Sequence, residues 1–239
     1  MQTVNGFWIG ELGHMEQLTM LSFLDNDAKF ILWSYDTKIK NLPKNVILKN
    51  ASDIMPYEQV FRYPTKMNTN FGQNSYVGTS EIFRFKLLYE VGGWWTDMDV
   101  TCLKSIELIS EEYFFRTHGM LPTAGNIMKC PPKSQLMLNC YETAKEQINK
   151  NCQDWFLGMK ILCDNIKKLK LDQFIQEDKC NLDQLKYVKP LIKGCEKIPE
   201  NWIFIHWLNT IIDKNNYHPN SAFNQLLEKH NCKVEFKIF

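Results

Sequence analysis

The stretch GGWWTDMDV (residues 92–100) places two aspartates, Asp97 and Asp99, in an otherwise apolar run that predicts a β-strand. In a continuous strand, residues i and i+2 point to the same face, so the two carboxylates would lie together. Two carboxylates so close repel each other, and burial makes the repulsion worse. A divalent cation such as Mg²⁺ or Mn²⁺ relieves it, because these ions bind carboxylate oxygens together with substrate phosphates. The stretch therefore predicts a metal–diphosphate site at a strand end, although an isolated D-x-D also arises by chance as a solvated turn.

The segments around this stretch alternate between strand and helix patterns. Residues 80–91 have apolar side chains at helical spacing, and Gly92 and Gly93 end this predicted helix. The alternation predicts an α/β fold in which helices cover a sheet. Residues 62–79 are interpreted as a loop, and the weakly patterned residues 171–200 as an insertion. Strands are expected at residues 6–9, 29–35, 45–49, 94–103, 112–118 and 201–208, and the other helices at 14–24, 134–150, 154–170 and 221–230.

Length and composition suit one α/β domain or two small ones, and we expect the former. The 239 residues suit a single domain over 1–239, and the hydrophobic fraction of 44% provides a sizeable core. A net charge of +1 gives no support for nucleic-acid binding or a polybasic membrane patch. No apolar run reaches the ~18 residues of a transmembrane segment, and the N-terminus lacks the secretory pattern.

The eight cysteines are irregularly spaced and form no C-x-x-C pair. Such spacing favours neither a zinc site nor a small disulfide scaffold. We interpret them as reduced thiols and expect a cytoplasmic protein.

Residues 80–106, SEIFRFKLLYEVGGWWTDMDVTCLKSI, resemble the D-x-D sugar-binding region of glycosyltransferase family 32. That family includes fungal α-1,6-mannosyltransferases, animal α-1,4-galactosyltransferases and bacterial capsular-polysaccharide transferases. Glu81 and Trp95 depart from it, standing where the family has Asp and Tyr. Shorter stretches at 7–10, 21–36, 125–134 and 204–210 resemble other parts of the family in the same order. The matching positions are Ser80, Arg84, Leu88, Tyr89, Gly92, Gly93, Asp97 and Asp99.

This resemblance implies a GT-A fold, a mixed central sheet flanked by helices that binds nucleotide-diphospho-sugars. It implies a metal-dependent enzyme that transfers a sugar with retention of configuration. UDP-glucose or UDP-galactose is the expected donor, and a hydroxyl of a glycan, lipid or protein is the expected acceptor. Asp97 and Asp99 are the implied ligands of Mn²⁺ or Mg²⁺, and Asp97 also an implied donor contact. A cytoplasmic enzyme of this kind would be peripheral to any membrane that carries its acceptor.

The resemblance also assigns roles to residues near the donor. Glu81 and Arg84 are three residues apart and therefore lie on one face of a helix. The resemblance implies that Glu81 contacts a ribose hydroxyl and that Arg84 contacts the phosphate or the sugar. The alternative is a surface ion pair, which contributes little. Trp8 is implied to stack on the uracil base, with core packing as the alternative. Asn126 and Asp154 are weaker candidates for contacts with sugar hydroxyls.

His206 follows the apolar run WIFI, where a histidine is ordinarily a hydrogen-bonded core residue. A cation bound by two aspartates and a diphosphate still has vacant positions, however, and imidazole suits Mn²⁺ better than Mg²⁺. The resemblance places a His-Trp pair in this region. We therefore expect His206 to be a third metal ligand or a diphosphate contact, with Trp207 donating its N–H to the diphosphate.

Two other functions are compatible with paired aspartates. A metal-dependent nucleotidyltransferase or phosphohydrolase would need a further carboxylate, and the sequence singles out no good candidate. A catalytically silent fold that only binds sugar nucleotides is disfavoured because Asp97, Asp99 and Arg84 are all present.

Overall fold

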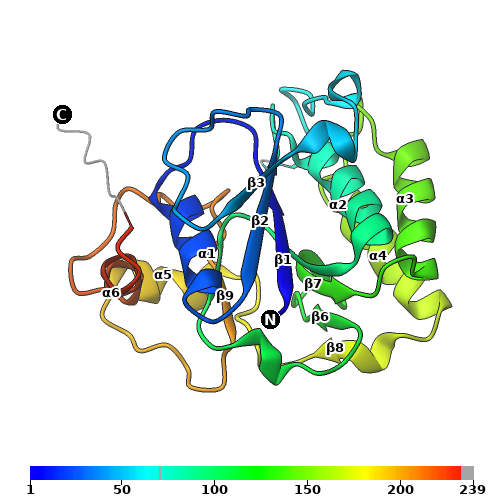
Figure 1. Ribbon diagram of the computed structural model, residues 1–239. Coiled ribbons are helices and arrows are strands. Elements are labelled where there is room, and N and C mark those ends of the chain that lie inside the picture. The colour runs from blue at the N-terminus through cyan, green and yellow to red at the C-terminus, as the bar shows by residue number, and fades with distance from the viewer. Residues whose placement is uncertain (70, 233–239) are drawn as a thin grey trace. The chain divides into compact units, whose positions relative to one another are not determined.

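The computed structural model describes residues 1–69 and 71–232 and has a mixed α/β fold (Figure 1). The α/β prediction is thereby confirmed. The strands are β1 (Thr3–Phe7), β2 (Lys29–Ser34), β3 (Ile47–Asn50), β4 (Gly93–Thr96), β5 (Val100–Cys102), β6 (Phe114–Arg116), β7 (Ala124–Cys130), β8 (Ile175–Gln176) and β9 (Phe204–His206). The α-helices are α1 (His14–Leu24), α2 (Val77–Val91), α3 (Gln135–Gln147), α4 (Leu157–Lys168), α5 (Leu185–Lys193) and α6 (Ala222–Lys229).

The chain is divided into two compact units, each assembled from separate stretches of sequence. Unit 1 comprises Met1–Lys49, Thr96–Ile109 and Asp178–Phe239, and unit 2 comprises Asn50–Trp95 and Ser110–Glu177. Strands β3, β2 and β1 lie side by side in unit 1, and strands β4, β7, β6 and β8 lie in that order in unit 2. The single domain expected over residues 1–239 stays a prediction.

Unit 1 begins with a β-α-β arrangement. Strands β1 and β2 pair in parallel, from Thr3 opposite Lys29 to Phe7 opposite Trp33. A parallel pair needs a crossover connection, and α1 provides it over the residues that the sequence predicted. Helix α1 packs on β2 and also on β5.

A second, two-stranded sheet completes unit 1. Strands β5 and β9 run antiparallel, with Val100 opposite His206 and Cys102 opposite Phe204. Beside it lies a hydrophobic cluster that joins α1, α5 and α6 through residues such as Leu18, Val188 and Phe223. The second sheet and this cluster together position the residues that flank the D-x-D motif.

In unit 2, three helices pack in sequence order beside the strands. Helix α2 contacts α3, α3 contacts α4, and α4 contacts β7. Strand β6 pairs antiparallel with β7 and parallel with β8. Gly92 ends α2 at φ +64°, and a Cβ there would lie 2.4 Å from the backbone nitrogen of Pro132. Both reasons make glycine necessary, as the sequence predicted.

The structure corrects the continuous strand expected for residues 94–103. Strand β4 ends at Thr96, a turn carries Asp97, Met98 and Asp99, and β5 begins at Val100. Aspartate is disfavoured in strands and favoured in turns, where side chains bond to nearby backbone. The Thr96 hydroxyl donates to the carbonyl of Asp97 at 3.0 Å. The alternation of strand faces therefore does not orient the two carboxylates.

Residues 171–200 are also more than the insertion expected from the sequence, because they supply β8 to unit 2 and α5 to unit 1. Among the described residues, none of the helices combines the length and apolar character that a membrane crossing requires.

Candidate active site

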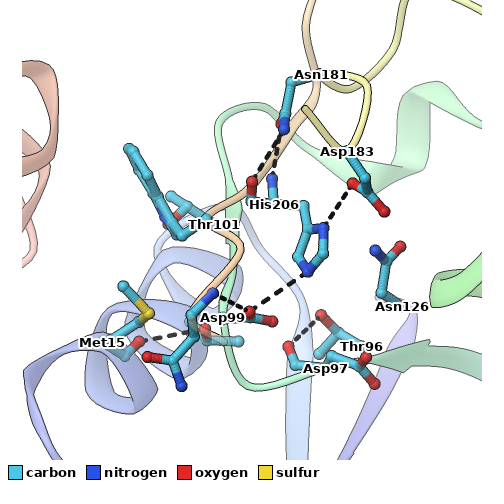
Figure 2. Close-up of polar contacts among 12 residues, drawn as sticks. Met15, Thr96, Asp97, Asp99, Thr101, Asn126, Asn181, Asp183 and His206 are labelled. Carbon is cyan, nitrogen blue, oxygen red and sulfur yellow. Dashed lines mark hydrogen bonds and ion pairs between the residues drawn. The ribbon is translucent and has the colours of Figure 1, made fainter. Parts of the chain in front are cut away.

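The turn between β4 and β5 brings Asp99 to His206. The β5–β9 register sets His206 opposite Val100, the residue after Asp99. As Figure 2 shows, the ring of His206 points at the Asp99 carboxylate, with Nε2 3.4 Å from Oδ2. Two residues that the sequence analysis assigned to one metal site, one before β5 and one at the end of β9, thus lie together.

Asp99 is held on its main chain and on its side chain by the residues that follow β9. Its carbonyl oxygen accepts the backbone N–H of Trp207 at 2.9 Å, and Oδ2 accepts that of Asn209 at 3.0 Å. Burial raises the pKa of Asp99, but the facing His206 and the Asn209 N–H outweigh it, so the pKa lies below the ordinary 3.8. Asp99 is therefore a carboxylate at neutral pH.

His206 lies between two carboxylates. Its Nδ1 is 2.7 Å from Oδ1 of Asp183, on the side of the ring away from Asp99. Burial lowers the pKa of His206, but Asp183 and Asp99 together raise it well above 6.5. In the metal-free protein the ring is thus an imidazolium that neutralises part of the surrounding negative charge.

The donor set fits a divalent cation that shares its ligands with a substrate. Two adjacent ligands on an octahedral ion with bonds of ~2.1 Å are about 3 Å apart, close to the 3.4 Å between Asp99 Oδ2 and His206 Nε2. A carboxylate on the other ring nitrogen, here Asp183, is the usual partner of a metal-binding histidine. Within residues 1–69 and 71–232, no three His, Cys, Asp or Glu side chains form a ready metal cluster. The chain therefore suits an ion that completes its shell with diphosphate or water oxygens.

Trp207 is a core residue in this structure. It is fully buried, its ring packs edge-on against Phe223 with centroids 4.9 Å apart, and its indole N–H donates to the Thr101 hydroxyl at 2.7 Å. The N–H expected at the diphosphate is thus engaged within unit 1. Trp207 supports the site by anchoring the chain next to His206.

Trp8 directly follows β1 and is only partly buried, unlike the core tryptophans of the chain. Its backbone N–H donates to Trp33 at 3.0 Å, and its indole N–H donates to the carbonyl of Glu11, also at 3.0 Å. The structure thus disfavours core packing as its role, and stacking on the base stays a prediction.

Glu81 and Arg84 form a buried pair on α2. Their exposed fractions are 7% and 3%, so the alternative of a surface ion pair is wrong. Arg84 Nη2 lies 3.8 Å from Glu81 Oε1, and Nη1 donates to the carbonyl of Gly125 at 2.6 Å. A Cβ on Gly125 would lie 2.8 Å from Arg84 Nη1, and one on Gly158 2.0 Å from Glu81 Oε2. Two glycines therefore leave space for two buried charged side chains. Because burying charges is costly, this arrangement indicates that the pair has a specific role in the protein.

Asn126 and Asp154 both have local partners within unit 2. The Asn126 side-chain oxygen accepts from Arg116 Nε at 2.7 Å, and both residues are buried. Asp154 accepts the backbone N–H of Phe156 at 2.9 Å and pairs with Lys160 at 2.6 Å. Their contacts with sugar hydroxyls stay predictions.

Sequence reasoning missed Asp183 and its neighbour Asn181, which both contact His206. They lie in the weakly patterned 171–200 region, and Asp183 is a further carboxylate where none was expected. The sequence offered little to find them by, since N-x-D before a short helix is common and its partner lies 23 residues later.

Comparison with known proteins identifies the region that carries the D-x-D turn. The family described as the glycosyltransferase sugar-binding region containing a DXD motif matches residues 13–115. No curated protein matches the sequence.

Solved structures share the fold at low identity. PaToxG glycosyltransferase has a TM-score of 0.51 at 13% identity over 71% of this chain and 68% of its own. The galactosyltransferase LgtC, in complex with donor and acceptor sugar analogues, has a TM-score of 0.50 at 9% identity over 95% of each chain. The family match marks residues 13–115 as a glycosyltransferase sugar-binding region with a DXD motif, which makes the protein a glycosyltransferase, and the solved structures show that its fold is GT-A-like.

Proposed function

We propose that the enzyme transfers a hexosyl group from UDP-glucose or UDP-galactose to a hydroxyl of a glycan, lipid or protein acceptor, in a metal-dependent reaction. One observation carries the proposal: Asp99 faces His206 at 3.4 Å in a donor set that suits a divalent ion short of ligands. The phosphate oxygens of a sugar nucleotide would supply the remaining ligands of such an ion. The solved LgtC complex with donor and acceptor sugar analogues supports the same class of substrate.

Asp97, Asp99 and His206 would hold Mn²⁺ or Mg²⁺. When bound, such an ion supplies neutralisation of the negative charge on the leaving diphosphate. The protein's part is to present Asp99 as a carboxylate with a fixed orientation, which the Asn209 N–H and the Trp207 N–H achieve. Asp97 would in addition contact the donor. Transfer with retention of configuration is supported by the resemblance of residues 80–106 to retaining enzymes.

The remaining roles follow the same resemblance. We propose that Trp8 stacks on the uracil, that Arg84 contacts the phosphate or the sugar, and that Glu81 contacts a ribose hydroxyl. The burial of the Glu81–Arg84 pair supports a positioned rather than a solvated pair. Asn126 and Asp154 are proposed to contact sugar hydroxyls.

We also propose a reducing, cytoplasmic compartment, with the enzyme peripheral to any membrane that holds its acceptor. All eight cysteines are free thiols in the structure. Burial raises the pKa of Cys102 to about 12, and those of Cys130 and Cys140 well above their ordinary value. Such thiols are inert packing groups, as in proteins that make no use of disulfides.

The proposal is tested by measuring nucleotide release from a panel of sugar nucleotides, with Mn²⁺ or Mg²⁺ and with chelator. We expect UDP release from one UDP-hexose, in the presence of metal only, and calorimetric UDP binding that the chelator abolishes. Equal UDP affinity with and without metal would refute metal dependence. Release of pyrophosphate from nucleoside triphosphates would favour the nucleotidyltransferase alternative, and sugar-nucleotide binding without any turnover would favour a silent fold.

A further inference from the structure

The segment from Lys179 to Asp183 runs alongside β9 and bonds to its backbone. The carbonyl of Lys179 accepts the N–H groups of Ile203 and Phe204 at 2.8 and 3.0 Å. Further along, the amide of Asn181 donates to the carbonyl of His206 at 2.9 Å and accepts its N–H at 2.8 Å. A side-chain amide has one donor and one acceptor group, so Asn181 pairs with His206 as a neighbouring strand residue would. Asn181 is 1% exposed, which makes this pairing a buried one.

The same segment also fixes the ring of His206. Asp183 Oδ1 lies 2.7 Å from Nδ1. A carboxylate accepts hydrogen bonds and does not donate them, so the hydrogen of a neutral His206 ring is kept on Nδ1. Nε2 then presents its lone pair toward Asp99, the direction in which Figure 2 shows the ring pointing. Backbone and ring are thus held by two residues that are two positions apart.

We propose that Asn181 and Asp183 form a positioning element, the Asn181–Asp183 clamp, that sets His206 for binding a divalent cation. The inference rests on the proposed metal site. Neither residue touches the cation: Asn181 fixes where the His206 backbone lies, and Asp183 fixes which nitrogen carries the hydrogen and how the ring is turned. Partners of this kind change metal affinity by about 10- to 100-fold when removed.

A purely structural role for Asp183 predicts a different outcome. If Asp183 only stabilised the folded chain, its removal would lower thermal stability and leave the metal affinity of the folded protein unchanged. The clamp predicts a loss of affinity, and a larger loss for Mn²⁺ than for Mg²⁺, because imidazole suits Mn²⁺ better. The ratio of the two affinities therefore separates the two roles.

Asp183→Asn is the main variant. Its amide has the size of the carboxylate but is neutral, and its NH2 group can donate to Nδ1 where the carboxylate can only accept, so the ring hydrogen is no longer held on Nδ1. Asp178→Asn is the matched control, since Asp178 directly precedes this segment, is exposed and has a left-handed backbone (φ 57°) that Asn tolerates. Both variants remove one negative charge, so a general charge effect would appear in both.

The measurement is Mn²⁺ and Mg²⁺ binding by calorimetry, without nucleotide and without turnover, on proteins whose thermal unfolding shows them folded. We expect Asp183→Asn to weaken Mn²⁺ binding roughly 10- to 100-fold, with a smaller effect on Mg²⁺ and no effect of Asp178→Asn. In a His206→Gln background, Asp183→Asn should have no further effect, because the residue it positions is gone. Wild-type Mn²⁺ affinity in folded Asp183→Asn overturns the clamp.

If Asp183→Asn does not fold, Asp183→Glu takes its place. Glutamate keeps the charge but displaces the acceptor by one methylene, so a weakened Mn²⁺ affinity is again expected and an unchanged one overturns the clamp. Failure of the metal site itself gives a separate result. If the wild-type protein binds no Mn²⁺ even with UDP, the proposed function fails. If the wild-type protein binds Mn²⁺ and His206→Gln weakens this binding while the Asp183 variant does not, only the clamp fails and the proposed function stands.

Discussion

His206 and Asp99 face each other beside the antiparallel pair β5–β9, with Nε2 of the ring 3.4 Å from Oδ2 of the carboxylate. This contact joins the D-x-D turn to a strand near the other end of the chain. It also puts a cationic ring where a divalent ion would bind, so a proton and the metal ion compete for Nε2 of His206.

Replacing Asp99 tests the metal anchor. We expect Asp99→Ala to fold and to lose turnover by about a thousandfold or more, because a Lewis-acid metal supplies several kcal/mol and each ~1.4 kcal/mol is tenfold. UDP release from the preferred donor is the measurement, with Asp178→Asn as a control that leaves turnover unchanged. Near-normal transfer by Asp99→Ala would show that Asp99 is not the anchor.

The competition at His206 predicts how metal-free stability varies with pH. The pKa of His206 is raised in the folded protein, so its stabilising contribution is complete below 6.5 and is lost as pH rises through the folded pKa. Mn²⁺ affinity should rise over the same range, because the ion displaces the proton. Asp99, whose pKa is lowered, contributes above 3.8 and loses its contribution as pH falls through its folded pKa.

Thermal unfolding in chelator and Mn²⁺ calorimetry, from about pH 6 to 10, measure both effects. His206→Gln should flatten both profiles on the alkaline side, since no titrating ring remains. Unaltered profiles in this variant would place the titration elsewhere.

Trp8→Ala should weaken UDP binding and leave the choice of sugar unchanged. Base–aromatic stacking is worth ~1–3 kcal/mol, or roughly 5- to 150-fold in affinity. Calorimetry with UDP and metal measures the loss, and Trp8→Phe, which keeps a ring, should retain most of the affinity. If Trp8→Ala binds UDP normally, the base does not stack on Trp8. If the variant fails to fold, Trp8 is a structural residue.

Gly158→Ala tests the buried charge pair of unit 2. The added Cβ would lie 2.0 Å from Glu81 Oε2, so Glu81 must shift away from Arg84. We expect a loss of about 1–3 kcal/mol in the free energy of unfolding, as for other overpacked interiors. In a Glu81→Ala background the same substitution should cost much less, because its clash partner is absent. Equal costs in both backgrounds would place the strain elsewhere.

The parts of the fold that depend on local pattern were predictable from the sequence. Helix α1 occupies His14–Leu24 as expected, because its apolar residues recur at helical spacing within one short window. The end of α2 at Gly92 was equally readable, since glycine at positive φ is a local necessity. Strand β7 was not predicted, because its sequence AGNIMKC lacks the alternation that marks a strand.

The site was predictable only in part, for a physical reason. The D-x-D motif and His206 stood out by composition and resemblance, but the orientation of Asp99 depends on hydrogen bonds that the distant residues Trp207 and Asn209 supply. Asp183 acquires its place solely through tertiary pairing with His206. The sequence around a residue that is positioned by a non-local contact contains no periodic pattern that would mark it.

The dependence of Asp99 on Trp207 and Asn209 has a consequence for biosynthesis. A ribosome that has just completed residue 115 has made the whole DXD-containing region, yet none of the partners that hold Asp99. The two aspartates emerge from the exit tunnel long before the chain that closes around them. A product terminated early would carry the motif and no site, so the cell gains a working enzyme only when synthesis has passed Asn209.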